Sequence, residues 1–249
     1  SGSVTTDTTA PTLSSVSIAS DNTNTSKARP GDDVTLTFTA SEAIGTPVVT
    51  FRSGGDAITD GSVVYSNTSG NTWRAVYTAN ASDTDGAVTY SIAFSDTSGN
   101  AGTAVTSGSG SVTTDTTAPT LSSVSIASDN STSTLAKAND DVTLTFTASE
   151  SISTPTVTFR SGGDAITDGS VVYRNTSGNT WTAVYTANAS DTDGAVTYSI
   201  AFSDTAGNAG TAVTSGSGSV TTDTSAPTLS NVSIASDNST STLAKANDD

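Results

Sequence analysis

The chain has 249 residues, of which 24 are acidic and 8 are basic, so its formal net charge is −16. This charge repels nucleic-acid phosphates, and no apolar run approaches the roughly 18 residues that span a bilayer, which excludes nucleic-acid binding and direct membrane insertion. The sequence contains neither Cys nor His, which excludes disulfides, thiolate metal sites and His-dependent Ser or Cys catalysis. We therefore expect a protein that is not an enzyme and whose carboxylates attract cations.

The sequence repeats with a period of 108 residues. Residues 34–141 align without a gap to residues 142–249, with eight mismatches. A unit of this length can bury its own core, unlike the shorter repeats of solenoids. Because the chain starts late in one repeat and ends early in another, we expect a window of a longer tandem array. The expected division is a final strand of a preceding repeat (1–9), two complete units (10–116 and 117–224), and the start of a following repeat (225–249).

Apolar residues alternate with Thr and Ser through most of the first unit, which is typical of half-buried strands. Turn-forming clusters rich in Asp, Asn, Gly and Ser separate these segments. The expected strands, in chain order, are residues 13–20, 34–39, 48–52, 62–66, 73–77, 88–94 and 101–114. Seven strands in about 100 residues predict an all-β fold of tandem immunoglobulin-like β-sandwiches, arranged end to end. Trp73 and Tyr90 are expected in the core, with Tyr90 at the position of the corner tyrosine of such sandwiches.

Several sequence stretches carry a family resemblance. The segments "DTTAPT", "VTLTFTASE", "NTWTAVYT", "GAVTYSIAFSDTAGNAG" and "VTTDTSAPT" resemble bacterial Ig-like repeats, and the resemblance covers both complete units. Such repeats form the stalks of large surface adhesins, many of which are exported by type I secretion with repeats-in-toxin C-termini. The resemblance implies an extracellular position on a bacterial cell surface, a stalk role, and calcium at domain junctions.

The sandwich topology predicts where acidic side chains converge. At the N-terminal end of a sandwich, the incoming connection meets the loops that follow the second and sixth strands. Carboxylate and amide oxygens are the donors that Ca²⁺ prefers, and the single Glu of each repeat suggests a ligand that needs a longer reach than Asp. The predicted ligands are Asp7, Glu42, Asp96 and Asn100 in the first unit and Asp115, Glu150, Asp204 and Asn208 in the second.

The preceding unit presents its opposite end to the same junction. Its loop "NASDTDG" carries Asp83 and Asp85, repeated as Asp191 and Asp193, and Asp223 repeats the connecting aspartate at the end of the second unit. These five residues are further candidate Ca²⁺ ligands. The alternative is that the aspartates only form Asx turns and keep the chain soluble. The turn interpretation is preferred for five other residues: Asp21, Asp32, Asp33, Asp56 and Asp60.

Three functions remain open. The leading hypothesis is a stalk of extender repeats that Ca²⁺ rigidifies at the junctions, with neighbouring repeats of the same chain as partners, projecting a distal binding region. The first alternative is a subunit of an extracellular filament or surface layer, in which copies pack laterally. The second is a set of carbohydrate- or protein-binding modules, which requires a solvent-facing aromatic patch. Tyr65 and Tyr173 are the only aromatic residues that the pattern does not place inward.

Overall fold

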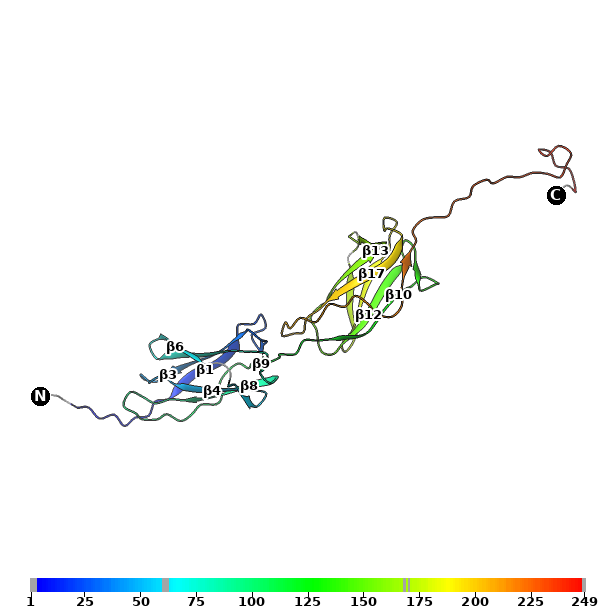
Figure 1. Cartoon of the computed structure of the whole chain (residues 1–249). Helices are drawn as coiled ribbons and strands as arrows, with labels where there is room; N and C mark the ends of the chain where they lie inside the picture. Colours follow the sequence, from blue (N-terminus) through cyan, green and yellow to red (C-terminus); the bar gives the residue numbers. More distant parts are fainter. Residues whose placement is uncertain (1–3, 60–62, 168, 170, 248–249) are drawn as a thin grey trace.

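The computed structural model describes residues 4–59, 63–167, 169 and 171–247. The chain folds into two β-sandwiches that follow one another along its length (Figure 1). Every regular element in the described ranges is a strand. The described residues contain no helix that is long and apolar enough to cross a membrane. The fold is therefore all-β, with two immunoglobulin-like domains in tandem, as predicted.

The first sandwich packs a four-stranded sheet against a five-stranded sheet. The orders are β1-β3-β7-β6 and β2-β9-β8-β4-β5, with antiparallel pairs except for the parallel pair of β2 and β9. Its strands are β1 (Leu13–Ser20), β2 (Lys27–Ala28), β3 (Asp33–Ala40), β4 (Val48–Ser53), β5 (Asp56–Ala57), β6 (Val64–Ser69), β7 (Thr72–Thr78), β8 (Gly86–Ala93) and β9 (Thr113–Thr114).

The second sandwich repeats this plan, with sheet orders β10-β12-β16-β15 and β11-β18-β17-β13-β14. Its strands are β10 (Leu121–Ser128), β11 (Leu135–Ala136), β12 (Asp141–Ala148), β13 (Thr156–Ser161), β14 (Asp164–Ala165), β15 (Val172–Ser177), β16 (Thr180–Thr186), β17 (Gly194–Ala201) and β18 (Thr221–Thr222). Residues 223–247 form no strand.

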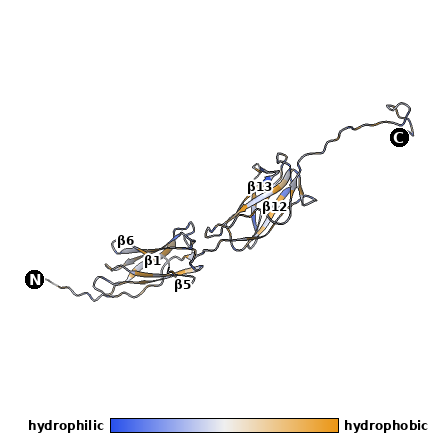
Figure 2. Ribbon diagram, viewed as in Figure 1, coloured by the Kyte–Doolittle hydropathy of each residue, from blue (hydrophilic) through white to orange (hydrophobic). Residues whose placement is uncertain are grey.

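The predicted alternation forms the core. Val34, Leu36 and Phe38 of β3 are fully buried, and their Thr neighbours are not. Across the sandwich, the ring centroids of Phe51 and Tyr77 lie 4.8 Å apart, which joins the two sheets. Figure 2 shows that apolar residues lie along the strands of both sandwiches.

The two aromatic residues expected in the core behave differently. Trp73 is half-buried and packs against the core, whereas Tyr90 is buried within it. The Tyr90 hydroxyl makes none of the side-chain hydrogen bonds found in the described ranges, so the tyrosine-corner interpretation is not supported.

The last strand differs from the prediction. The segment 101–114 was expected as one strand, but only β9 is regular, and the rest joins its neighbours through single bridges such as that between Ile92 and Val105. Glycines explain the interruption, because they let the segment approach a neighbouring strand, β1, too closely for a side chain. A Cβ at Gly110, where φ is 77°, would lie 2.2 Å from the carbonyl oxygen of Ile18.

Two short strands were not predicted. β2 lies in the segment expected to be the first turn, and β5 lies in the turn after the third predicted strand. Both have two residues, which is too short for alternation to be visible in the sequence. The fourth strand, expected over residues 62–66, is β6 and begins at Val64, while its expected first residue lies outside the described ranges.

Candidate metal centre

The connection between the sandwiches is residues 115–120, between β9 and β10. Its start is held by the first unit. The carboxylate of Asp85 accepts hydrogen bonds from the backbone N–H of Thr116 at 2.6 Å and from the hydroxyl of Thr117 at 2.7 Å. The N–H of Asp115 donates to the carbonyl of Ala28 at 2.9 Å. The connection is therefore an ordered joint rather than a slack linker.

Three of the predicted carboxylates meet at this joint. One carboxylate oxygen from each of Asp115, Glu150 and Asp204 lies within 4.8 Å of the other two. The residues come from the connection, from the loop after β12 and from the loop after β17, as the topology predicts. Oxygens on opposite sides of one Ca²⁺ lie up to about 5 Å apart, so this spacing and this donor set suit the ion.

The same arrangement occurs at the start of the first unit. Asp7, Glu42 and Asp96 also offer carboxylate oxygens within 4.8 Å of one another. Asp7 is exposed, Glu42 is intermediate and Asp96 is buried. The convergence is thus a property of the repeat and not of one loop conformation.

Asp204 also organises its own loop. One of its carboxylate oxygens accepts the backbone N–H groups of Ala206, Gly207 and Asn208 at 2.8, 2.6 and 2.8 Å. The side-chain amide of Asn208 donates to the other oxygen at 2.7 Å and to the carbonyl of Asp115 at 2.8 Å. Asp204 and Asn208 therefore fix the loop and tie it to the connection.

Asp96 and Asn100 repeat these contacts in the first unit. The Asn100 amide donates to the Asp96 carboxylate at 2.7 Å and to the carbonyl of Asp7 at 3.1 Å. The hydrogen bond from the Asn100 side chain is the largest influence on Asp96 and lowers the pKa of its carboxyl. The Asx-turn alternative thus correctly describes what Asp96 and Asn100 do within their loop. Forming this turn does not prevent the pair from also binding a metal ion.

The charges at the joint are not balanced. Burial raises the pKa of the Glu150 carboxyl, and the negative charges of Asp115, Asp204 and Asp85 raise it further. Burial also raises the pKa of Asp115, with the charge of Asp204 as the next cause. The ammonium group of Lys27 opposes both shifts. A cation bound among these carboxylates would remove this repulsion.

The candidate ligands from the loop "NASDTDG" of each unit lie outside the two clusters of three carboxylates found in the described ranges. Asp83 and Asp191 accept the N–H groups of Asn80 and Asn188, at 3.0 and 3.1 Å, which closes their own turns. Neither belongs to a cluster of three carboxylates within the described ranges.

Asp85 and Asp193 instead hold the connections. Burial raises the pKa of Asp85, but the hydrogen bonds from Thr116 and Thr117 outweigh burial and lower it. Asp193 makes the equivalent bonds to Thr224 and Ser225, of which the Thr224 N–H contributes most to lowering its pKa. Asp223, the counterpart of Asp115, is exposed and accepts the N–H of Ser225 at 3.2 Å.

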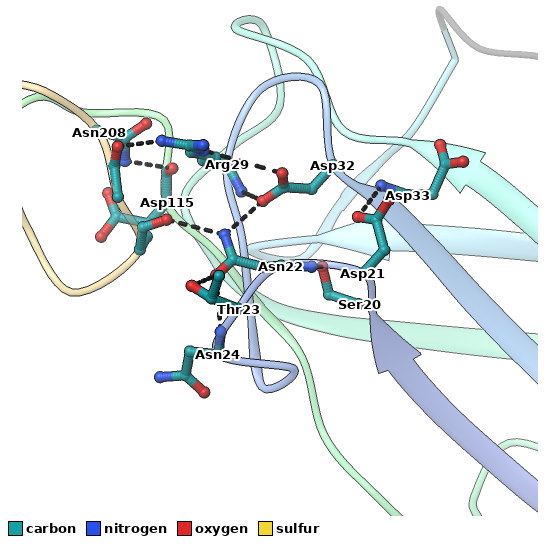
Figure 3. A network of polar contacts seen from close by, with 12 residues as sticks. Ser20, Asp21, Asn22, Thr23, Asn24, Arg29, Asp32, Asp33, Asp115 and Asn208 are labelled. Atoms are coloured by element: carbon teal, nitrogen blue, oxygen red, sulfur yellow. Dashed lines mark hydrogen bonds and ion pairs between the residues drawn. The ribbon is translucent and has the colours of Figure 1, made fainter.

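Sequence reasoning missed two residues that cross the joint. The side-chain amide of Asn22 donates to the carbonyl of Ala206 at 2.9 Å, and the guanidinium of Arg29 donates to the carbonyl of Gly207. Figure 3 shows both side chains extending from the first unit toward the segment that carries Asn208, beside Asp115. The sequence pattern predicts only a turn for the segment that carries them.

Of the aspartates expected to form turns, within the described residues only Asp32 closes a local turn, by accepting the backbone N–H of Arg29 at 2.9 Å, and the others bind residues farther along the chain. Asp21 accepts the N–H of Asp33, and Asp33 in turn accepts the Thr78 hydroxyl, at 2.8 and 2.7 Å. Asp32 accepts the Asn22 amide at 2.6 Å. Asp56 likewise accepts the Thr84 hydroxyl at 2.8 Å. Asp60 lies outside the described residues.

The aromatic patch that a binding module requires is not found in the described ranges. Tyr65 is half-buried, packs against the core, and accepts a hydrogen bond from the backbone of Val49. Tyr173 makes the same contact with Val157. The exposed large hydrophobic residues of the described ranges are aliphatic.

No family model matches the chain, and no curated protein matches it. Among solved structures, the I-band fragment I67–I69 of titin is similar, with 11% identity and a TM-score of 0.45 over 88% of this chain and 66% of that fragment. A chimeric titin Z1Z2 functionalised with a KLER exogenous peptide from decorin gives 15% identity and a TM-score of 0.32, over 89% of this chain and all of that one. The chain thus spans just under two thirds of the I67–I69 fragment. The immunoglobulin-like assignment rests on the sheet orders described above.

Proposed function

We propose that the chain consists of structural extender repeats in the stalk of a bacterial cell-surface adhesin, projecting a distal binding region away from the cell. Ca²⁺ rigidifies the junctions in this proposal. The tandem sandwiches and the sequence resemblance to bacterial Ig-like repeats support the stalk role. The observation that carries the calcium role is the cluster of Asp115, Glu150 and Asp204, because one of its carboxylates belongs to the connection and two belong to the second sandwich.

The position of Asp115 gives the ion a mechanical role. Asp85 of the first unit already holds Thr116 and Thr117. An ion shared by Asp115, Glu150 and Asp204 would hold the same connection to the second unit, so the joint would be fixed from both sides. Without the ion, like charges at short range loosen it. Asp7, Glu42 and Asp96 would act in the same way toward a preceding unit.

The substitution Glu150→Gln tests the metal role, because the proposal predicts opposite signs in two conditions. In excess chelator the variant should melt at a higher temperature than the parent chain, since one repelling charge is gone. In millimolar Ca²⁺ it should melt at a lower temperature, since a ligand has been weakened. Calorimetry of the whole chain gives both values.

Asp164→Asn is the matched control, because Asp164 lies outside the carboxylate clusters and accepts the Thr192 hydroxyl at 2.7 Å. It should show no change of sign between the two conditions. If Ca²⁺ and chelator give the parent chain the same melting temperature and the same maximum dimension in small-angle scattering, the metal role is wrong. If chains instead associate side by side as the protein concentration is raised, that result would favour the filament alternative.

A further inference from the structure

The differences between the repeats are concentrated in one short segment. Residues 1–22 are identical to 109–130, and Asp32 and Asp33 are repeated as Asp140 and Asp141. Between them, "TNTSKARPG" at 23–31 corresponds to "STSTLAKAN" at 131–139, and only the alanine at the sixth position is shared. The latter sequence occurs again, unchanged, at 239–247. We call these nine residues the joint segment.

The joint segment lies where the first unit meets the second. It follows Asn22, contains β2, and carries Arg29, whose guanidinium binds the carbonyl of Gly207. Gly207 has a φ of 93° and its missing side chain leaves the space that Arg29 enters, since a Cβ there would lie 2.9 Å from the guanidinium. At Gly99, the equivalent glycine of the first unit, a Cβ would meet nothing within 4 Å.

The other form of the segment is built differently. Lys137 replaces Arg29, and its ammonium group binds Asp140 of its own unit at 3.0 Å, whereas the Arg29 guanidinium lies 3.9 Å from the equivalent Asp32 and also binds the carbonyl of Gly207. Leu135 replaces Lys27, and it is 47% exposed in a unit that is followed by residues 223–247, which form no strand. An ammonium group lacks the planar fork with which a guanidinium binds two acceptors at once. Asn130 is retained and still donates to Asp140 at 2.6 Å.

We infer that the joint segment sets how firmly a unit holds the unit that follows it. Its partner is the turn Asp204–Asn208, or the equivalent turn, of the next copy of the repeat. The form "TNTSKARPG" makes a fixed joint through the contact of Arg29 with the carbonyl of Gly207, and the form "STSTLAKAN" makes a looser joint. The inference rests on the proposed extender function, and it adds that stiff and flexible joints are encoded along one array.

The test measures the distance between the units. The chain has no cysteine, so Thr50→Cys and Thr158→Cys, both at exposed strand positions, provide the only spin-label sites. Replacing residues 23–31 by "STSTLAKAN" should broaden the distance distribution from electron double resonance. Losing the partly exposed Arg29 contact should raise the ratio of undocked to docked joints about tenfold. All samples contain excess chelator, so the result does not depend on calcium.

The control places "TNTSKARPG" at residues 131–139, in the unit whose far end leads into residues 223–247, which form no strand. It should leave the distribution unchanged. The single substitution Arg29→Lys avoids any failure of the nine-residue exchange to fold, and it should broaden the distribution to a smaller extent. An unchanged distribution in both the exchange and Arg29→Lys, or equal broadening in the control, overturns the inference. Failure of the calcium proposal would appear separately, as an absent response of the parent chain to Ca²⁺.

Discussion

The hydroxyl of Tyr65 accepts the backbone N–H of Val49 at 2.8 Å, and so joins the edge strand of one sheet to a strand of the other. Val49 lies in β4, beyond the short stretch that β5 covers, so this N–H has no strand partner on that side. Tyr173 and Val157 repeat the contact in the second unit. The tyrosines thus cover part of an exposed edge that could otherwise pair with another chain.

Replacing Tyr65 by Phe should therefore destabilise the first unit by about 1–2 kcal/mol, because the N–H of Val49 loses its partner. Urea unfolding of the whole chain measures the effect. Tyr90→Phe is the control, since its hydroxyl makes no side-chain hydrogen bond found in the described ranges, and it should change stability by less. Equal losses in the two variants would show that the contact with Val49 contributes nothing.

The sequence predicts those parts of the fold that depend on burial. Alternation predicts β3 and β8 because Val34, Leu36 and Phe38 must face one side, and immunoglobulin-like topology predicts that Asp115, Glu150 and Asp204 lie together. The sequence could not predict the breaks in residues 101–114. A glycine that is needed because two backbone segments lie close together cannot be distinguished, in the sequence, from any other glycine. The sequence could not predict the Arg29 contact either. Its acceptor is a backbone carbonyl, and because every residue has one, no residue type marks this position as an acceptor. The clustering of differences at residues 23–31 was the available signal.

Gly86 occupies a position that leaves no room for a side chain. Its φ is 142°, and a Cβ there would lie 2.7 Å from the Cα of Gly54 in the facing turn. Gly86→Ala should therefore cost about 2–3 kcal/mol or more, from backbone strain and overpacking together. Gly55→Ala separates the two causes, because φ is 96° but nothing lies within 4 Å of the new Cβ. If the two variants unfold at the same urea concentration, the close approach to Gly54 is not a constraint.

Ser123 occupies a left-handed conformation, with φ at 52°, and Ser15 does the same. The third copy has Asn231 at this position, with φ at 55°. Asn tolerates this region better than other residues with a Cβ. Ser123→Asn should stabilise the second unit by about 0.5 kcal/mol, whereas Ser123→Ala should not. Melting temperatures that fall in the Asn variant would contradict this assignment.

The two units carry an arginine on opposite strands of the same cross-strand pair. Ser66 and Arg74 are direct cross-strand partners on β6 and β7, and their counterparts are Arg174 and Thr182. Each unit thus keeps one guanidinium and one hydroxyl at this cross-strand pair. Ser66→Arg alone should destabilise the first unit by about 0.5 kcal/mol, because two like charges face each other.

Adding Arg74→Thr should restore the stability that Ser66→Arg removes, since the double variant reproduces the pair found in the second unit. A double-mutant cycle from urea unfolding gives the coupling between the two positions. Additive effects would mean that the exchange of positions is unrelated to the pairing of β6 with β7.

The carboxyls at the joint predict a pH dependence whose sign differs from that of ordinary acid unfolding. The pKa values of Glu150 and Asp115 are raised above 4.5 and 3.8, so the folded protein binds protons there more readily than the unfolded chain does. In chelator, the second unit should therefore become more stable as pH falls from 7 toward about 4.5, as these groups lose their repelling charges. Below that range the trend reverses, because groups such as Asp140, with a pKa lowered to about 2, lose stabilising contacts when they are protonated.

Calorimetry between pH 7 and 4.5 measures this gain, and Glu150→Gln should reduce it because one of the two carboxyls with a raised pKa is gone. A gain of equal size in the variant would assign the pH dependence to other carboxyls. In millimolar Ca²⁺ the direction should invert, since the ion binds only ionised carboxylates and acid releases it. The same three side chains would then destabilise the metal-free joint at neutral pH and stabilise the calcium-loaded joint, which is the behaviour expected of a stalk that becomes rigid only where calcium is abundant.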